Sequence, residues 1–312
     1  MFRLVMRRLL SMVPVLLLVL LLVMGLVELM RGDLAAVLGG EDAVPEQVAA
    51  LKHRLGLDQS LPERFVGFLG NALTGDLGTS WLTGRAVWTS IRSALPVTLS
   101  LAFLAMLLAI LIAVPVGILA AARPSPALDR FFTMGTSVVL AVPEFVVGLI
   151  LVTYVSLKTG WFPATGYSSF GDGPLEWLQH LLLPAITLAL PLAAQLTRQV
   201  RAAMISALAQ DSIRTARAAG MSERTVVLND ASRLAALPVV TVIGLQISRA
   251  VGGAVIVEQV FAMPGYGSLA VDAVIKRDVP VLQGVVLVSA VMVLLTNTMV
   301  DLFNGYLNPR LR

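Results

Sequence analysis

The sequence contains no cysteine, and only three lysines and two histidines among its 312 residues. Neither a disulfide framework nor a thiolate metal site is therefore available. The histidines, His53 and His180, stand alone, without the H-E-x-x-H spacing of a zinc protease, and no G-x-S-x-G is present. A G-x-x-x-x-G-K-[ST] loop for nucleotide phosphates is also absent. We therefore predict no catalytic residue, no metal site and no enzyme activity.

Charge is scarce as well, since 13% of the residues are charged and 57% are hydrophobic, with a mean hydropathy of +0.85. A chain of this length is then too apolar for a soluble domain, and we predict an all-α integral membrane protein. The net charge of +4 raises the question of nucleic acid binding. The arginines, however, flank apolar runs, so membrane topology explains them and no nucleic-acid partner is expected.

Uncharged runs predict six transmembrane helices, because about 20 apolar residues cross a hydrocarbon core of about 30 Å. The spans are expected at residues 9–27, 93–122, 131–157 (interrupted at Pro143-Glu144), 181–197, 238–257 and 279–300. A cleaved signal peptide is the competing reading of the first run, but Met30 to Asp33 offers no small-x-small cleavage site. Loops with Gly and Pro are expected on the outer side after Leu157 and after Glu258.

Four regions follow from these spans: an N-terminal helix (1–30), an outer region (31–93), a membrane domain (94–305) and a short tail (306–312). Within the outer region, Pro45 and Pro62 each precede apolar residues at helical spacing, which predicts two short amphipathic helices. The simplest interpretation is a small cap on the outer ends of the spans.

Basic residues set the orientation. Residues 1–8, 123–130, 198–236 and 306–312 hold thirteen arginines and no lysine, whereas the short loops on the other side hold only Lys158, Lys276 and Arg277. Because cytoplasmic loops carry the excess of Lys and Arg, both termini and residues 198–236 are expected in the cytoplasm.

Residues 211–238 form a polar, Arg-bearing segment between apolar runs. Gly220 suits the left-handed end of one helix, and Ser222 suits the N-cap of the next. Small residues at the bend admit another backbone, and the guanidinium groups of Arg214 and Arg217 suit carboxylates or carbonyls. The pattern predicts a helix, a tight bend and a second helix that together form a docking surface.

This segment resembles the cytoplasmic coupling loop of ABC importer permeases, and in particular that of the dipeptide/oligopeptide type. The resemblance rests on Ile213-Arg-Thr-Ala-Arg-Ala-x-Gly220, on Leu237-Pro238-Val-Val-Thr241 and on Glu258-x-x-Phe261-x-x-Pro264-Gly265-x-Gly267. It runs nearly end to end. Arg214 stands where the generic loop has Glu, and Ser212 where this type usually has an aromatic residue.

The resemblance implies the type I ABC importer permease fold with six transmembrane helices and a helical extracytoplasmic loop between the first two. The implied partners are a homologous second permease, two nucleotide-binding ATPase domains that bind ATP and Mg, an extracytoplasmic solute-binding protein, the lipid bilayer and a peptide substrate. The chain itself needs no cofactor, and its location would be a bacterial inner membrane. Residues implied in coupling are Arg214, Thr215, Ala216, Arg217, Ala218, Gly220, Ser222 and Glu223.

Several alternatives stay open. Relatives of this type also import a nickel chelate or haem, and the sequence does not choose among these cargoes. The outer region, which shares Leu55-Gly-Leu-Asp58 and Gly75-Asp-Leu-Gly78 with the family, would contact the solute-binding protein. A secondary transporter or a non-transporting membrane scaffold belongs to a different class, and co-purification of an ATPase separates these from the importer.

Charged residues inside spans are costly and usually face inward or pair. Glu144 lies 13 residues from the inner end of the third span and Arg249 lies 11 from that of the fifth, at depths of about 20 and 17 Å. We hypothesise that they pair or share a polar cavity, and that Glu144, Gln246 and Arg249 belong to the translocation path. The alternative is that each one separately faces subunit packing or water.

Overall fold

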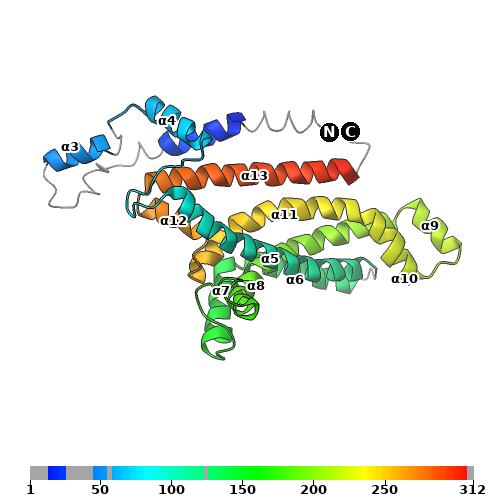
Figure 1. Cartoon of the computed structure of the whole chain (residues 1–312). Coiled ribbons are helices and arrows are strands. Elements are labelled where there is room, and N and C mark those ends of the chain that lie inside the picture. Colours follow the sequence, from blue (N-terminus) through cyan, green and yellow to red (C-terminus); the bar gives the residue numbers. More distant parts are fainter. Residues whose placement is uncertain (1–12, 26–44, 55–57, 123–125, 308–312) are drawn as a thin grey trace. The chain divides into compact units, whose positions relative to one another are not determined.

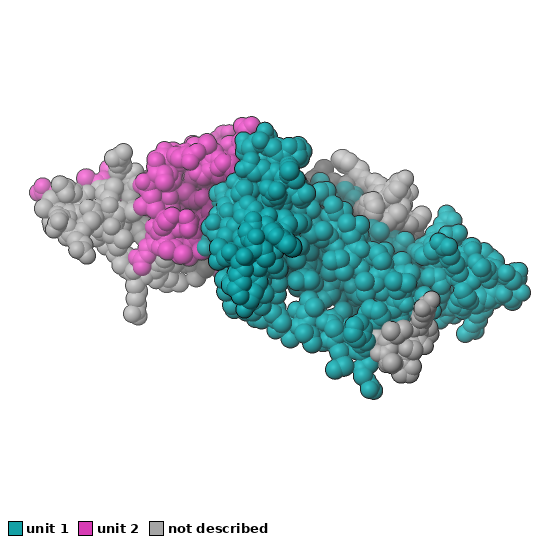
Figure 2. All heavy atoms as spheres, turned by 90° about the horizontal axis from the view of Figure 1, so that it is seen from below, with its two compact units in different colours: residues 1, 96–267, 295–312 teal, residues 2–95, 268–294 magenta. Residues whose placement is uncertain are grey.

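The computed structural model describes residues 13–25, 45–54, 58–122 and 126–307. Within these ranges the regular structure is helical, apart from an isolated bridge between Thr79 and Ala86. The chain divides into two compact units (Figure 2), one of residues 96–267 and 295–312 with residue 1, the other of residues 2–95 and 268–294.

The first unit is built on two long helices, α8 (Pro174–Leu208) and α11 (Ser232–Val260), which pack side by side (Figure 1). The greater part of α5 (Val87–Ala122) and the end of α13 (Val279–Leu307) also belong to this unit. Gly173 is the N-cap of α8, so this helix begins before the predicted Leu181. It also continues past Arg201, beyond the predicted end of the span at residue 197, and ends at Leu208, so that Ala209 and Gln210 separate it from α9 (Asp211–Ala218).

A sharp bend separates α6 (Pro126–Ala141) from α7 (Glu144–Leu151), which continues as a π-helix, η1 (Val152–Leu157). The two parts are bent by 86°. Pro143 is the N-cap of α7 and has extended dihedrals. A helix cannot easily run through this point, because proline disfavours the helical conformation in the preceding Val142 and has no N–H to donate. The predicted interruption at Pro143-Glu144 is therefore confirmed.

Small residues allow the helices of the first unit to approach closely. The buried stripe of α5 contains Ala102, Ala105, Ala109 and Ala113. A Cβ at Gly117 of the same helix would lie 2.7 Å from Val200 Cβ on α8, and one at Gly244 of α11 would lie 2.6 Å from Val300 Cγ2 on α13. Such close packing replaces hydrophobic exclusion as the main source of helix association in a membrane.

The second unit contains the helix Val13–Gly25, α3 (Pro45–Arg54), α4 (Leu61–Leu73), the first turns of α5, most of α12 (Tyr266–Ile275) and the first half of α13. The two short helices predicted after Pro45 and Pro62 are present as α3 and α4, and their position on the outer side stays a prediction. At the start of α4 the Ser60 N–H donates to Glu63 Oε2 at 2.9 Å. The loop expected between Glu258 and Val279 was wrong in part, because α12 occupies ten of those residues.

The described residues contain four helices that are long and apolar enough to cross a membrane, or five if α6 to η1 counts as one bent span. They correspond to predicted spans two, four, five and six, with the bent pair as span three. The first predicted span is described only from Val13 to Gly25, and its other residues lie outside the described ranges, as do residues 31–44 and 308–312. The chain is a multi-pass membrane protein, and six spans stays a prediction.

Candidate functional site: the bend at Gly220 and the polar groups of the long helices

The predicted bend at Gly220 joins α9 (Asp211–Ala218) to α10 (Glu223–Thr225). Gly220 has a φ of 84°, as the left-handed prediction requires. The Met221 N–H donates to Ala216 O at 3.2 Å and the Gly220 N–H to Arg217 O at 3.0 Å. These two bonds form a Schellman motif, which satisfies the last carbonyls of α9 and fixes the direction of the chain.

Two side-chain contacts stabilise the other side of the bend. Ser222 is the N-cap of α10, as predicted, and its Oγ accepts from the Thr225 N–H at 3.3 Å. Arg217 binds Glu223 through Nε to Oε1 at 2.7 Å and Nη2 to Oε2 at 3.2 Å. This bond raises the pKa of Arg217. The forked geometry restrains the angle between α9 and α10.

The bend is held to the long helices by one buried side chain. Ile213 of α9 is 1% exposed and packs in a cluster with Met204 of α8, Val226 and other apolar residues. Residues Val226 to Ala231 form a π-helix, η2, that continues directly into α11. The helix α9 thus packs on α8 through this cluster and is joined along the chain, through α10 and η2, to α11 (Figure 1).

Seven of the eight residues implied in coupling are exposed around this bend: Arg214, Thr215, Arg217, Ala218, Gly220, Ser222 and Glu223. Ala216 is half-buried and packs against the Ile213 cluster instead. Arg214 contacts Asp211, one turn before it, at 3.3 Å. Arg217 already uses its fork within the bend, so Arg214 presents the more accessible guanidinium.

A second polar group lies within the membrane helices. Gln246 is 1% exposed, and its Nε2 donates to Gln195 Oε1 of α8 at 2.7 Å. The Nη1 group of Arg249 donates to the same Gln195 oxygen at 2.8 Å and to Gln246 Oε1 at 3.3 Å. Gln195 was not among the predicted site residues, although an amide within a span is a signal that sequence reading offers.

Glu144 does not join this group. Its Oε2 is buried and has no hydrogen-bond partner among the described residues, and no ion pair within 4.0 Å connects it to Arg249. The carboxylate lies against Gly253, where an added Cβ would be 3.5 Å from Oε2. Direct pairing of Glu144 with Arg249 is therefore not observed.

A buried carboxylate also follows the fifth span. Glu258 is 0% exposed, and the Thr98 hydroxyl donates to its Oε1. The Tyr266 N–H in turn donates to Thr98 Oγ1 at 2.8 Å. A Cβ at Gly267 would lie 3.0 Å from Glu258 Oε2. The residues from Glu258 to Gly267 thus form a loop that packs over the Glu258 carboxylate, and glycine is needed at Gly267 to leave room for it.

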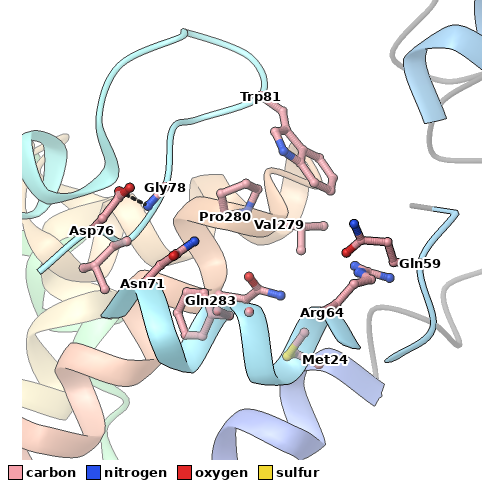
Figure 3. Close-up of a pocket in the computed structure, with 13 residues that line it drawn as sticks. Met24, Gln59, Arg64, Asn71, Asp76, Gly78, Trp81, Val279, Pro280 and Gln283 are labelled. Atoms are coloured by element: carbon pink, nitrogen blue, oxygen red, sulfur yellow. Dashed lines mark hydrogen bonds between the residues drawn. The ribbon is translucent and has the colours of Figure 1, made fainter. Parts of the chain in front are cut away.

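The second unit has a small pocket of about 260 Å³ (Figure 3). Gln59 and Arg64 lie on one side of it, and Trp81 and Pro280 on the other. The loop that carries Trp81 is fastened by Asp278, which accepts from Ser80 Oγ at 2.5 Å and from the Trp81 N–H at 3.2 Å. The pocket combines polar and apolar groups, as surfaces that receive another protein commonly do.

The apolar spans, the charged bend and the glycine loop define a transport permease, and the chain belongs to the family described as the binding-protein-dependent transport system inner membrane component, which matches residues 113–312. The N-terminal component of the same family matches residues 1–102. The chain is thus a permease of the ABC importer type.

Similar proteins extend over nearly the whole chain. A probable peptide ABC transporter permease of Sinorhizobium fredii is 37% identical over 99% of this chain and 98% of its own length. A putative peptide transport system permease of Brucella suis is 39% identical over 98% of each. A glutathione transport system permease of Escherichia coli is 37% identical over 99% of this chain and 98% of its own.

Solved structures support the fold. The inward-facing MetNI methionine ABC transporter aligns with a TM-score of 0.60 at 17% identity, over 70% of this chain and 96% of that one. An amino acid ABC transporter crystallised with histidines aligns with a TM-score of 0.55 at 18% identity, over 70% and 94%. The type I importer permease fold predicted from the sequence is thereby confirmed at the level of helix arrangement.

Proposed function

We propose that this chain is one of two homologous permease subunits of an ATP-driven importer of di- and oligopeptides. The names of its relatives, at 37–39% identity over nearly the full length, support a peptide-like cargo. ATP and Mg bind to two nucleotide-binding domains of partner subunits. An extracytoplasmic solute-binding protein delivers the peptide to the outer region, where the pocket beside Trp81 is a candidate contact.

The observation that carries this proposal is the construction of the bend at Gly220. Its exposed face is polar, its internal geometry is fixed by the Schellman motif and the Arg217–Glu223 fork, and its inner face is anchored by Ile213. A surface of this kind suits a partner that pushes on it. From Glu223 to Val260 the chain is helical for 38 residues, about 57 Å at 1.5 Å per residue.

The mechanism that follows is alternating access. ATP binding draws the two nucleotide-binding domains together, the bend moves with them, and α8 and α11 carry the movement into the membrane. The excess of arginine in residues 198–236 supports a cytoplasmic bend, with both termini on the same side of an inner membrane. Glu144, Gln246 and Arg249 belong to the polar part of the path between the two permeases.

Reconstitution tests the proposal. The chain is purified with its partner subunits, placed in proteoliposomes and supplied with ATP inside and the binding protein outside. We expect uptake of a radiolabelled di- or tripeptide that requires ATP and the binding protein. Uptake driven by an ion gradient without ATP would assign the chain to secondary transport, and ATP-driven uptake of a nickel chelate or haem alone would replace the peptide cargo.

A further inference from the structure

Arg249 carries a charge that this chain does not neutralise. Its Nη1 group donates to Gln195 Oε1 at 2.8 Å and to Gln246 Oε1 at 3.3 Å, and both acceptors are neutral amides. Among the described residues, Arg249 forms no ion pair. A guanidinium carries N–H donors on all of its nitrogens, so those on Nε and Nη2 are left for an anion that another molecule supplies.

The depth of Arg249 in the membrane limits what neutralises it. This residue lies about 17 Å along α11 from the inner end of the predicted fifth span, near the middle of a hydrocarbon core of about 30 Å. Phospholipid headgroups lie outside that core, and contact of a charged side chain with lipid tails costs about 2.5 kcal/mol or more. The side of α11 that carries Arg249 therefore faces protein or water and not lipid.

Arg249 belongs to a regular stripe of exposed residues on α11, which we call the α11 seam. Its members are Leu245, Arg249, Gly252 and Ile256, of which Leu245 is 51% and Ile256 47% exposed. They follow one another at four, three and four residues, which is the alternation by which one helix packs along another. The two large apolar side chains favour a facing helix over a water-filled channel.

A different stripe of α11 makes the contacts within this chain. Ala250, Ala254 and Val257 are at most 1% exposed and pack in one cluster with residues of α5 and α8. At 3.6 residues per turn, this stripe lies about 140° around the helix from the α11 seam. Gln246 lies between the two stripes, and its buried amide holds Arg249 at the edge of the seam. The α11 seam is thus left for a second chain.

We propose that the α11 seam packs against a helix of the second permease, and that Arg249 forms an ion pair with a carboxylate on that helix. Gln195 and Gln246 are positioning residues, because they hold Nη1 and leave the rest of the guanidinium for the carboxylate. The ion pair then forms part of the wall of the path between the two permeases.

This contact rests on the proposed function, which supplies the second permease, and it names the surface and the residue that recognise that subunit. Two copies of this chain in one membrane orientation bring Arg249 against Arg249 in a symmetric pair. Like charges disfavour that pair. The carboxylate therefore selects a different subunit over a second copy of this chain.

Photo-crosslinking of the assembled transporter in membranes tests the α11 seam. The photoreactive residue p-benzoylphenylalanine replaces Leu245, Ile256 or, as the matched control, Ile247, one at a time. Ile247 is 41% exposed and lies two residues from Leu245, about 200° around the helix. We expect cross-links to the second permease from positions 245 and 256 and none from position 247.

Capture of the second permease by the tagged chain tests the ion pair. Loss of one partner of a buried charge pair should weaken association of Arg249→Gln by about thirtyfold or more. Arg249→Lys keeps the charge without the fork and should retain part of the affinity. Arg130→Gln, which changes an exposed arginine of α6, is the control and should associate normally. Arg249→Glu should regain capture when the carboxylate in the cross-linked segment of the partner is replaced by arginine.

Equal cross-linking from positions 245 and 247 would overturn the seam, as would a second copy of this chain as the cross-linked partner. Reaction of Leu245→Cys or Ile256→Cys with a water-soluble thiol reagent in the resting complex would assign this face to a water-filled path instead. Unchanged capture by Arg249→Gln would overturn the ion pair. If the cross-links form but the complex imports no peptide, the proposed function fails while the seam stands. If ATP-driven import of peptide occurs without these cross-links, the seam alone fails.

Discussion

Substitution of Gly220 by valine disturbs the backbone conformation of the bend and leaves all of its polar side chains in place. No atom lies within 4 Å of a Cβ placed at Gly220, so the added side chain meets no steric obstacle. The cost arises from the backbone, because φ is 84° and a left-handed residue other than glycine costs about 1–2 kcal/mol, with β-branched residues the least tolerated.

Such a cost lowers the population of the native bend by about five- to thirtyfold. Relief of the strain requires a change of φ, which breaks the Met221–Ala216 and Gly220–Arg217 bonds of the Schellman motif. The insertion of the apolar helices is unaffected, since the bend contributes little apolar burial. We therefore expect an inserted, assembled subunit that couples poorly.

The assay compares ATP hydrolysed with peptide imported in proteoliposomes that contain the complete complex and binding protein. The ratio should rise at least fivefold for Gly220→Val, less for Gly220→Ala and least for Gly220→Asn, because asparagine tolerates the left-handed region. Gly135→Val is the control: this glycine is helical, and a Cβ there also meets nothing within 4 Å. Unchanged coupling in Gly220→Val, or equal effects of valine and asparagine, would refute the reasoning.

Other substitutions test separate parts of the structure. Glu223→Gln removes one charge of the fork across the bend and should reduce coupling, with partial recovery in Arg217→Glu/Glu223→Arg, as measured by the same ratio. Gly244→Val forces a Cβ to 2.6 Å from Val300 Cγ2 and should lower the free energy of unfolding of the subunit by about 1–3 kcal/mol, seen as a lower melting temperature of the complex. Gly252→Ala, with open space around it, should leave the melting temperature unchanged. His53 bonds Asp58 at 2.6 Å, which raises the pKa of His53 and lowers that of Asp58. The stability that this pair gives to the end of α3 is therefore greatest between the unfolded pKa of Asp, about 3.9, and that of His, about 6.5. It is lost as the pH rises through the higher folded pKa of His53, and also as the pH falls through the lower folded pKa of Asp58. An NMR titration should show that Asp58→Asn returns the His53 pKa to its ordinary value.

Local signals explain why the bend was predictable. Gly220 favours the left-handed conformation that ends a helix, and Ser222 favours the N-cap position that begins the next one. Both preferences depend on the residue itself and not on distant partners. The break at Pro143 was predictable for the same reason. The cap on α4 follows from the sequence Ser60-Leu-Pro-Glu63, which is also read locally.

Tertiary partners were not predictable. The sequence placed Glu258 at the start of a loop and in a motif of the family, but it did not show that the carboxylate is buried and accepts from Thr98, 160 residues earlier. The α12 helix lies among glycines and a proline that indicate a loop, and it packs within a unit that the sequence does not delimit. Arg217 pairs with Glu223 because the angle of the bend brings them together, and the hydrophobic periodicity of the sequence does not predict that angle.

One measurement tests most directly the claim that the bend at Gly220 contacts an ATPase subunit in the cytoplasm. Because the chain has no cysteine of its own, an introduced cysteine is the only thiol in this subunit. A single cysteine is introduced at exposed Ala218, and another, separately, at exposed Trp161, in the fully assembled transporter in membrane vesicles. We expect the Ala218 cysteine to form a cross-link with the ATPase subunit that changes in yield when ATP binds, and the Trp161 cysteine to react only with reagents outside. Labelling of the Ala218 cysteine from the outside, or no cross-link to any ATPase, would contradict the account.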